Sequence, residues 1–337
     1  MSCFPAACSS PHHSSFFGSM PSNNNNEHDR TDQGRLEQEA RAWLLRLTSG
    51  DATEVDRDAF LRWQARGPQY EAAIRDALRL WQQIGTAAAV TRRHSRVPSR
   101  RSVLQGGAIA ASVAGLAFAG SKLGFLPTLQ DAFADYKTIA GEQRRLAFPG
   151  DITVELNTRS GLSHETAKGE GHLRLVSGEA AFTSHSRMGS ILTLSAGRAV
   201  VAASNAVFVV RLDGNGTAIS CLEGSLDLLM PETGQLRAGQ QAWCENGHIA
   251  TTAIADMDAV SAWRKGQLIF RDKPLGKVAS ELNRYKKGLV IVVDDAAAQR
   301  RVTGVFHLSR IDEALDHISN ALGLPIRHLS PFFTMIG

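Results

Sequence analysis

The stretch VLQGGAIAASVAGLAFAGSKLGF, residues Val103 to Phe125, decides how the rest of the chain is interpreted. Lys122 is its only charged residue. At about 1.5 Å per residue, a helix of this length reaches roughly 34 Å, which is enough to cross a hydrocarbon core of about 30 Å. We therefore predict a single transmembrane helix at 103–125. The alternative is a buried helix rich in alanine and glycine, because these residues make the stretch only weakly apolar.

Charge on the two sides of this stretch predicts its orientation. Five arginines lie between Arg92 and Arg101, and arginines gather on the cytoplasmic side of a membrane helix. We therefore predict a single-pass inner-membrane protein with a cytoplasmic N-terminus and a periplasmic C-terminus. The sequence SRRSVLQGG, which contains Arg100 and Arg101, is similar to the twin-arginine export motif, although Gln105 stands where the motif prefers lysine. An ordinary anchor with flanking arginines is the alternative.

Composition divides the rest of the chain into several units. The sequence has 337 residues, of which 43% are hydrophobic and 21% charged, and these values predict two or three globular domains. The net charge of +4 is smaller than the arginine cluster alone, so it predicts no direct contact with nucleic acid. Residues 1–33 are too polar to fold and are predicted to be a disordered tail. Residues 89–102 form an arginine-rich linker.

Residues 34–88 are predicted to form a small all-α domain in the cytoplasm. Apolar residues recur at helical spacing over residues 36–48. Asp51 and Glu54 are spaced as a capping box that starts a second helix, and Pro68 suits the first turn of a third. About fifty residues barely close a core, so we expect apolar surface to be offered to a partner. The residues that serve either as core or as candidate contacts are Trp43, Leu44, Leu47 and Trp63.

Residues 126–260 are predicted to form an antiparallel β-rich domain in the periplasm. Apolar and polar residues alternate in short runs, as in Ile152–Leu156, which is the period of half-buried strands. The dipeptides at Asp213–Gly214 and Asn246–Gly247 tolerate positive φ and predict hairpin turns.

Residues 261–337 are predicted to form an α+β domain built from a β-α-β repeat. The apolar stripe of one predicted helix returns 36 residues later with the same offsets. Its two copies are Leu275, Val278, Ala279 and Leu282, then Ile311, Ala314, Leu315 and Ile318. Leu289–Val293 is a wholly apolar short strand. Ser309 with Asp312 is predicted to cap the second helix, and Gly323 to end it.

Several of these stretches resemble one known family. The most distinctive are AWRKGQLIF, at Ala262–Phe270, and ELNRY, at Glu281–Tyr285. Weaker matches are Leu173–Phe182, LRAGQ at Leu236–Gln240, and the helix pair within Glu37–Trp63. On these residues the chain is similar to the FecR family of membrane-anchored sigma-factor regulators over nearly all of its length beyond residue 35. Departures at Pro149–Asp151 and Ser204–Asn205 fall in predicted turns.

The resemblance implies an anti-sigma factor. Its helical domain would bind an extracytoplasmic-function sigma factor. Its C-terminal domain resembles the short signalling domain of TonB-dependent transducers and secretins, so it would receive a signal from a TonB-dependent outer-membrane receptor. Iron or siderophore uptake is the usual context of the family. The candidate residues for the transducer contact are Leu289, Ile291, Val293 and Ile326.

Catalysis is not predicted. The sequence contains no nucleophile elbow, zinc-protease helix, phosphate loop or dinucleotide fingerprint. We therefore assign no catalytic, cofactor-binding or metal-binding residue and no small-molecule substrate. The alternative function is a membrane-anchored periplasmic ligand-binding or scaffold protein without a sigma partner. Spacing alone leaves open whether Cys221 and Cys244 form a disulfide.

Overall fold

The computed structural model describes residues 24–91 and 134–337, apart from short gaps at residues 166–170, 186–189, 215, 231–232 and 255. Within these ranges no helix is both long enough and apolar enough to cross a membrane. The predicted fold class, which included a single transmembrane helix, is therefore wrong on this point. The two long helices, at Asn24–Thr48 and Pro68–Thr91, both contain several charged residues, and the stretch 103–125 itself lies outside the described residues.

The first folded part, which we call the helical module, contains three helices: α1 (Asn24–Thr48), α2 (Glu54–Gln64) and α3 (Pro68–Thr91). The third helix begins at Pro68, as predicted. The capping box of α2 differs from the prediction, because Thr53 is the N-cap and Asp56 returns the hydrogen bond. Helix α1 also begins well before residue 36, within the tail that was predicted to be disordered.

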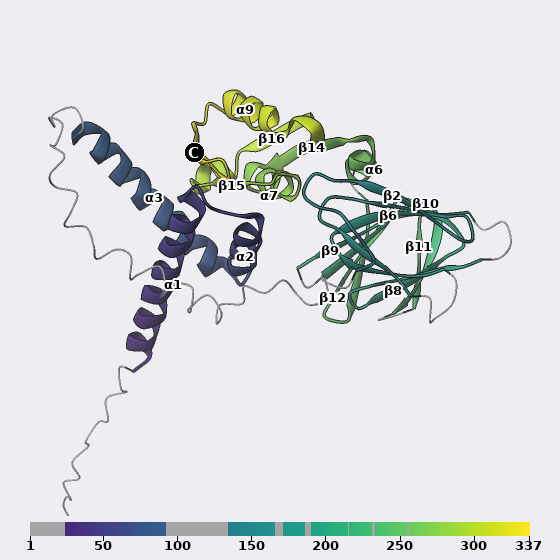
Figure 1. Ribbon diagram of the computed structural model, residues 1–337. Helices are drawn as coiled ribbons and strands as arrows, with labels where there is room; N and C mark the ends of the chain where they lie inside the picture. Colours follow the sequence, from purple (N-terminus) through teal and green to yellow (C-terminus); the bar gives the residue numbers. More distant parts are fainter. Residues whose placement is uncertain are drawn as a thin grey trace, which may run out of the picture.

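The second part is a β sandwich, drawn in teal and green in Figure 1. Its strands are β1 (Tyr136–Lys137), β2 (Arg144–Phe148), β3 (Ile152–Leu156), β4 (Gly161–His164), β5 (His172–Ser177), β6 (Glu179–His185), β7 (Leu192–Ala196), β8 (Ala199–Ala203), β9 (Asn205–Asp213), β10 (Gly216–Met230), β11 (Gly234–Arg237), β12 (Gln240–Glu245) and β13 (His248–Ala253). Pairing is antiparallel as predicted, except that β5 and β7 run parallel. The turns at Asp213–Gly214 and Asn246–Gly247 join β9 to β10 and β12 to β13.

The strand β10 holds the sandwich together. Its first half pairs with β9 and β12, and its second half pairs with β8 and β11. A bulge between Cys221 and Glu223 turns the strand from one layer into the other. Gly224 follows with φ of +73°, and a Cβ there would lie 2.2 Å from a carbonyl oxygen of β9. Only glycine fits this close approach.

The third part, which we call the C-terminal unit, contains the predicted β-α-β repeat. Its elements are α6 (Met257–Ser261), η3 (Ala262–Lys265), β14 (Gln267–Pro274), α7 (Leu275–Tyr285), β15 (Leu289–Val292), α8 (Asp295–Ala298), β16 (Arg301–His307), η4 (Leu308–Arg310), α9 (Ile311–Leu322), β17 (Ile326–Ser330) and β18 (Phe333–Ile336). Both predicted apolar stripes are buried, on α7 and α9. Gly323 ends α9 as predicted, but no side chain caps its start.

Sheet β15-β18-β17 has α7 and α9 over one face and the helical module against the other (Figure 1). This contact places the helical module and the C-terminal unit side by side. The predicted arrangement, in which a membrane separates the two, is therefore not the arrangement of this structure. The predicted inner-membrane localisation depends on residues outside the described ranges and stays a prediction.

Candidate functional site at the junction of the helical module and the C-terminal unit

The outer face of sheet β15-β18-β17 and the helical module share one apolar core. The sheet residues in this core are Leu289, Ile291, Val293, Phe333 and Met335. Val290 and Val292 point the other way, into the core of the C-terminal unit, because successive side chains of a strand alternate. Strands that are buried on both faces have continuous apolar sequences. The apolar run Leu289–Val293 is therefore explained by the helical module that covers its second face.

Ion pairs surround this shared core. The Arg159 Nη1 atom, from the turn after β3, lies 3.0 and 3.1 Å from the two carboxylate oxygens of Asp58 on α2. On the other side, Arg75 and Arg79 of α3 each lie 3.2 Å from the carboxylate of Asp295 on α8. All these side chains are partly exposed, so each pair contributes at most about 1 kcal/mol. Their main effect is to fix how the module sits on the sheet.

Arg57 is the polar side chain buried most deeply in the contact, with 2% of its surface exposed. It donates to the Asp58 carboxylate at 3.0 Å and to the backbone carbonyl of Asn283 at the end of α7. Its Nε atom has no hydrogen-bond partner. Burial, and then the positive charge of Arg159, lower the pKa of Arg57 to about 10. Arg159 also has a buried nitrogen, Nη2, without a hydrogen-bond partner, so both arginines of the contact are incompletely satisfied.

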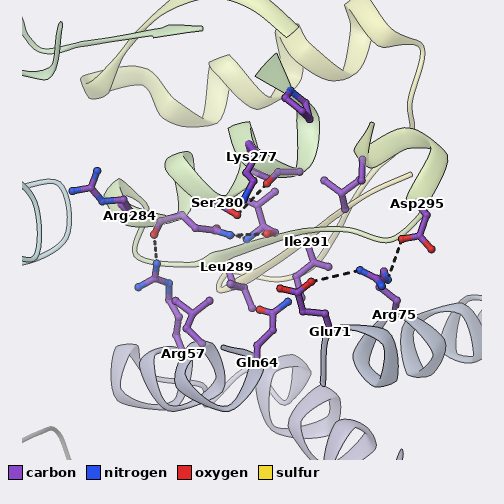
Figure 2. A pocket seen from close by; sticks show the side chains of 18 of the residues that line it. Arg57, Gln64, Glu71, Arg75, Lys277, Ser280, Arg284, Leu289, Ile291 and Asp295 are labelled. Atoms are coloured by element: carbon purple, nitrogen blue, oxygen red, sulfur yellow. Dashed lines mark hydrogen bonds and ion pairs between the residues drawn. The ribbon is translucent and has the colours of Figure 1, made fainter. Parts of the chain in front are cut away.

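A cavity of about 500 Å³ lies beside Arg57, between α2 and α3 on one side and α7, β15 and α8 on the other. Figure 2 shows the two walls, with Gln64 and Glu71 reaching up from the helical module and Leu289 and Ile291 lying on the sheet above. The two surfaces are thus in contact around the cavity but do not fill it, unlike the close packing of a domain core.

A second polar cluster joins α7 to the β sandwich. Arg284 donates to Glu179 of β6 at 2.8 Å and to Glu281 at 2.6 Å, and Glu281 also accepts from Arg211 of β9 at 2.8 Å. Burial acts to lower the pKa of Arg284, but the carboxylates of Glu179 and Glu281 outweigh it and raise that pKa. Burial acts to raise the pKa of Glu281, and Arg284 and Arg211 hold it below its usual value instead. Arg284 and Glu281 therefore stay ionised in this buried cluster because oppositely charged side chains lie beside them.

The last turn of α7 contacts all three folded parts. The amide of Asn283 bonds the backbone N–H and C=O of Val290 at 2.7 Å each, which fixes β15 beside α7. Tyr285 accepts a hydrogen bond from Asn157 of the sandwich at 2.7 Å. The Asn283 carbonyl accepts from Arg57 of the helical module. The sequence motif ELNRY singled out this turn, but not its role as the common junction.

The structure brings the candidate sigma-contact residues together in the core of the helical module. Trp43, Leu44, Leu47 and Trp63 are 8%, 2%, 0% and 2% exposed. The ring of Phe60 lies 5.8 Å from that of Trp43 and 5.9 Å from that of Trp63. Leu47 also meets the C-terminal unit, because its carbonyl accepts from the Ser330 hydroxyl at 3.0 Å. A direct sigma contact by these residues stays a prediction.

The candidate transducer-contact residues separate into two groups. Leu289, Ile291 and Val293 are covered by the helical module. Ile326 on β17 is half-buried and packs on the core of the C-terminal unit. Their contact with a transducer stays a prediction. Arg100 and Arg101 of the predicted export motif lie outside the described residues.

The polar residues of the junction were not found by sequence reasoning. Arg57 and Asp58 come from α2, and Arg159 comes from a turn of the sandwich a hundred residues further along the chain. No local pattern links positions so far apart. The one available signal was an arginine on the apolar side of a helix, beside Phe60.

The structure also shows how the potential metal ligands and the cysteines are arranged. In the described part of the chain, no group of three or more histidine, cysteine or acidic side chains is arranged to hold a metal ion. Cys221 and Cys244 are free thiols inside the sandwich core. Burial raises the pKa of both thiols, so they stay protonated at neutral pH.

Comparisons with known proteins agree with this organisation. Residues 134–227 match the model of the family described as FecR protein, and residues 38–80 match a domain of unknown function, DUF4880. The fold is similar to two crystal structures, at 1.65 and 2.50 Å resolution, of a "putative anti-sigma factor" from Parabacteroides distasonis ATCC 8503. The sequence identity is 20% in both, the TM-scores are 0.51 and 0.50, and the matches cover 60% of this chain and 97% and 96% of those chains. No curated protein matches the sequence.

A region similar to FecR protein therefore follows, along the chain, a helical region similar to DUF4880. The resemblance to the FecR family of regulators, read from the sequence, is confirmed.

Proposed function

We propose that this chain is an anti-sigma regulator whose helical module binds a sigma factor and whose β sandwich and C-terminal unit control that binding. The observation that carries the proposal is the pairing of the two family matches in one chain, with the DUF4880 match on the helices and the FecR match on the sandwich. The fold shared with the Parabacteroides protein supports it. The helical module supplies a small apolar three-helix body, which is suited to binding a protein rather than a small molecule.

The finer assignments rest on the family resemblance. The sigma factor is expected to be of the extracytoplasmic-function class. The signal is expected to come from a TonB-dependent transducer, in iron or siderophore uptake. One feature of the C-terminal unit supports a strand-pairing contact with such a transducer. Among the described strands, β17 pairs only with β18, so its outer edge is open to a further strand, whereas the outer edge of β15 is partly covered because Asn283 bonds the backbone of Val290.

The sigma partner can be tested by co-purification from the organism's own cells. A tagged full-length chain is expected to retain one sigma factor, identified by mass spectrometry, whereas a chain lacking residues 34–91 retains none. A transcription reporter for that sigma factor then gives the sign of regulation. If the full-length chain retains no sigma factor with or without the inducing signal, the alternative of a ligand-binding or scaffold protein replaces this proposal.

The transducer contact has a separate test. The signalling domain of a TonB-dependent transducer from the same organism is titrated into the full-length chain by calorimetry. Binding is expected, and a chain truncated after Trp263, which lacks β14 to β18, is expected to lose it. Unchanged binding by the truncated chain would place the contact outside the C-terminal unit.

A further inference from the structure

Trp243 of β12 carries an open aromatic face on the outer surface of the β sandwich. Its neighbours on the strand, Ala242 and Cys244, lie in the sandwich core, so Trp243 points outwards because successive side chains of a strand alternate. Its side chain is 37% exposed. Tryptophan combines a large apolar face with a single N–H donor, and this combination makes it common at binding surfaces. An exposed tryptophan held in a fixed position is therefore a candidate contact residue.

The indole ring of Trp243 is held against the sheet. Its Nε1 atom donates to the Glu245 carboxylate at 3.0 Å. The ring also fills the place that a side chain would take on Gly216 of β10, since a Cβ there would lie 2.2 Å from the ring atom Cζ2. One face of the ring therefore rests on the backbone of β10 and the opposite face is left to solvent. A ring that is already fixed loses little conformational entropy when a ligand covers it.

Polar side chains lie near the ring on the same face of the sheet. Ala218 of β10 pairs with Trp243 on one side and with Arg211 of β9 on the other. Arg211 lies 3.5 Å from Asp213, and both side chains are partly exposed. Because neighbouring strands are about 4.8 Å apart, the backbones at Trp243 and Arg211 are roughly 10 Å apart. Together with Glu245, this surface offers an aromatic face, a guanidinium donor and two carboxylate acceptors.

This combination of groups fits a saccharide ring. The face of a pyranose ring carries C–H bonds, whose partial positive charge is attracted to the negative face of an aromatic ring. Hydroxyl groups around its edge both donate and accept hydrogen bonds, so they match the carboxylates and the guanidinium. With two carboxylates to one guanidinium, the surface does not attract a polyanion such as nucleic acid. An apolar protein segment would need a wider apolar surface than one indole ring.

We propose that Trp243 is the centre of a polysaccharide-binding site, with Glu245, Arg211 and Asp213 as its polar contacts. The occupant is a glycan strand of the cell wall, with one sugar ring stacked on the open face of the indole. The predicted periplasmic location of the sandwich places it beside these strands. The site lies on the sandwich and not on the C-terminal unit, so it would hold the sandwich at the cell wall whether or not a sigma factor is bound.

Co-sedimentation with purified peptidoglycan sacculi tests the site. The full-length chain is expected to sediment with the sacculi. Trp243→Ala should weaken this binding at least tenfold, whereas Trp243→Tyr keeps an aromatic face and should retain most of it. Gly216→Ala leaves the indole unchanged but pushes it off the sheet, so it should also weaken binding. The matched control is Val305→Ala, which removes an apolar side chain that is 55% exposed on the C-terminal unit, and it should change nothing.

The ligand can be divided into its glycan and peptide parts. Binding is expected to persist with glycan strands that an amidase has freed of their peptides, and to disappear when a muramidase has cut the strands. Titrating the freed strands into the native chain should shift tryptophan emission to shorter wavelength, and Trp243→Tyr should lack this shift. The proposal is overturned if the native chain does not sediment with sacculi, if emission of the native chain does not shift, if Trp243→Ala binds as tightly as the native chain, or if free stem peptides compete in place of the glycan.

Discussion

Replacing Arg284 by glutamine tests the polar cluster that joins α7 to the β sandwich. The substitution keeps a side chain of similar size but removes the charge that faces Glu179 and Glu281. Glu179, Glu281 and Arg284 are 9%, 20% and 18% exposed, so both carboxylates would keep their negative charge in a poorly solvated place. Arg211 would still compensate Glu281, whereas Glu179 would have no cation.

The expected cost follows from this geometry. Removing one partner of a buried ion pair costs about 3–5 kcal/mol because it leaves a buried charge uncompensated. We take about 3 kcal/mol, the lower end, since Arg284 keeps some contact with water and Arg211 remains. With a denaturant slope of about 3 kcal/mol per molar urea, the unfolding midpoint should fall by roughly 1 M. The matched control is Arg310→Gln, which breaks an exposed pair with Glu313 at 3.4 Å and should cost less than about 0.5 kcal/mol.

The pH dependence of Arg284→Gln has a definite sign. In the native chain the pKa of Glu281 is held below its usual value, so its ionised form stabilises the fold above the unfolded pKa of about 4.3, and this stabilisation is lost as the pH falls through the lowered folded value. Without Arg284 the pKa of the Glu281 carboxyl rises. The loss of unfolding free energy relative to the native chain should therefore be largest at pH 7 and should become smaller towards pH 4. Urea unfolding of the full chain at pH 7 and pH 4, monitored by circular dichroism, measures this difference in stability. A midpoint equal to that of Arg310→Gln at pH 7, or a deficit that widens towards pH 4, would refute the reasoning.

Three further predictions concern local features. Gly224→Ala should destabilise the chain by more than about 3 kcal/mol because the added Cβ would lie 2.2 Å from a backbone oxygen of β9. Gly239→Ala is the control, since Gly239 also has a positive φ, +84°, but open space around it, and should cost only about 1 kcal/mol. Equal shifts of the melting temperature in the two variants would contradict the steric argument. Thr53→Ala should lower the stability of the helical module by about 1 kcal/mol through loss of its capping box, and Thr53→Ser should retain most of it, as read from thermal melts. Cys221 and Cys244 should resist a thiol reagent at pH 8 until urea is added, because both are buried and protonated; fast labelling of the folded chain would show that the sandwich opens there.

Local patterns predicted most of the secondary structure. Period-two runs marked the strands because one face of each sheet meets a core, and Gly323 marked a helix end because its left-handed conformation suits glycine. Capping was less well predicted. Asp51–Glu54 and Thr53–Asp56 both have the spacing of a capping box, and only the second coincides with the point where the chain turns into α2. The parallel pairing of β5 with β7 depends on contacts between distant segments, which periodicity does not encode.

The candidate site was only partly predictable. The apolar run Leu289–Val293 correctly indicated a short strand, but its burial on both faces was not predicted, because the sequence does not say what covers each face. The ELNRY motif was found by resemblance, and its hydrogen bonds to three parts of the molecule appear only once those parts are assembled. Membrane passage was inferred from residues 103–125 alone, without any information on whether the flanking parts contact each other.

The strand β10 has a consequence for how the sandwich comes apart. Because β8, β9, β11 and β12 all hydrogen-bond to this one strand, peeling either layer away exposes backbone groups of the other. A protease that nicked β10, or a force applied along it, would meet one barrier for both layers and leave no folded half behind. The sandwich is therefore expected to behave as one cooperative unit, with rearrangement confined to its contacts with the neighbouring parts.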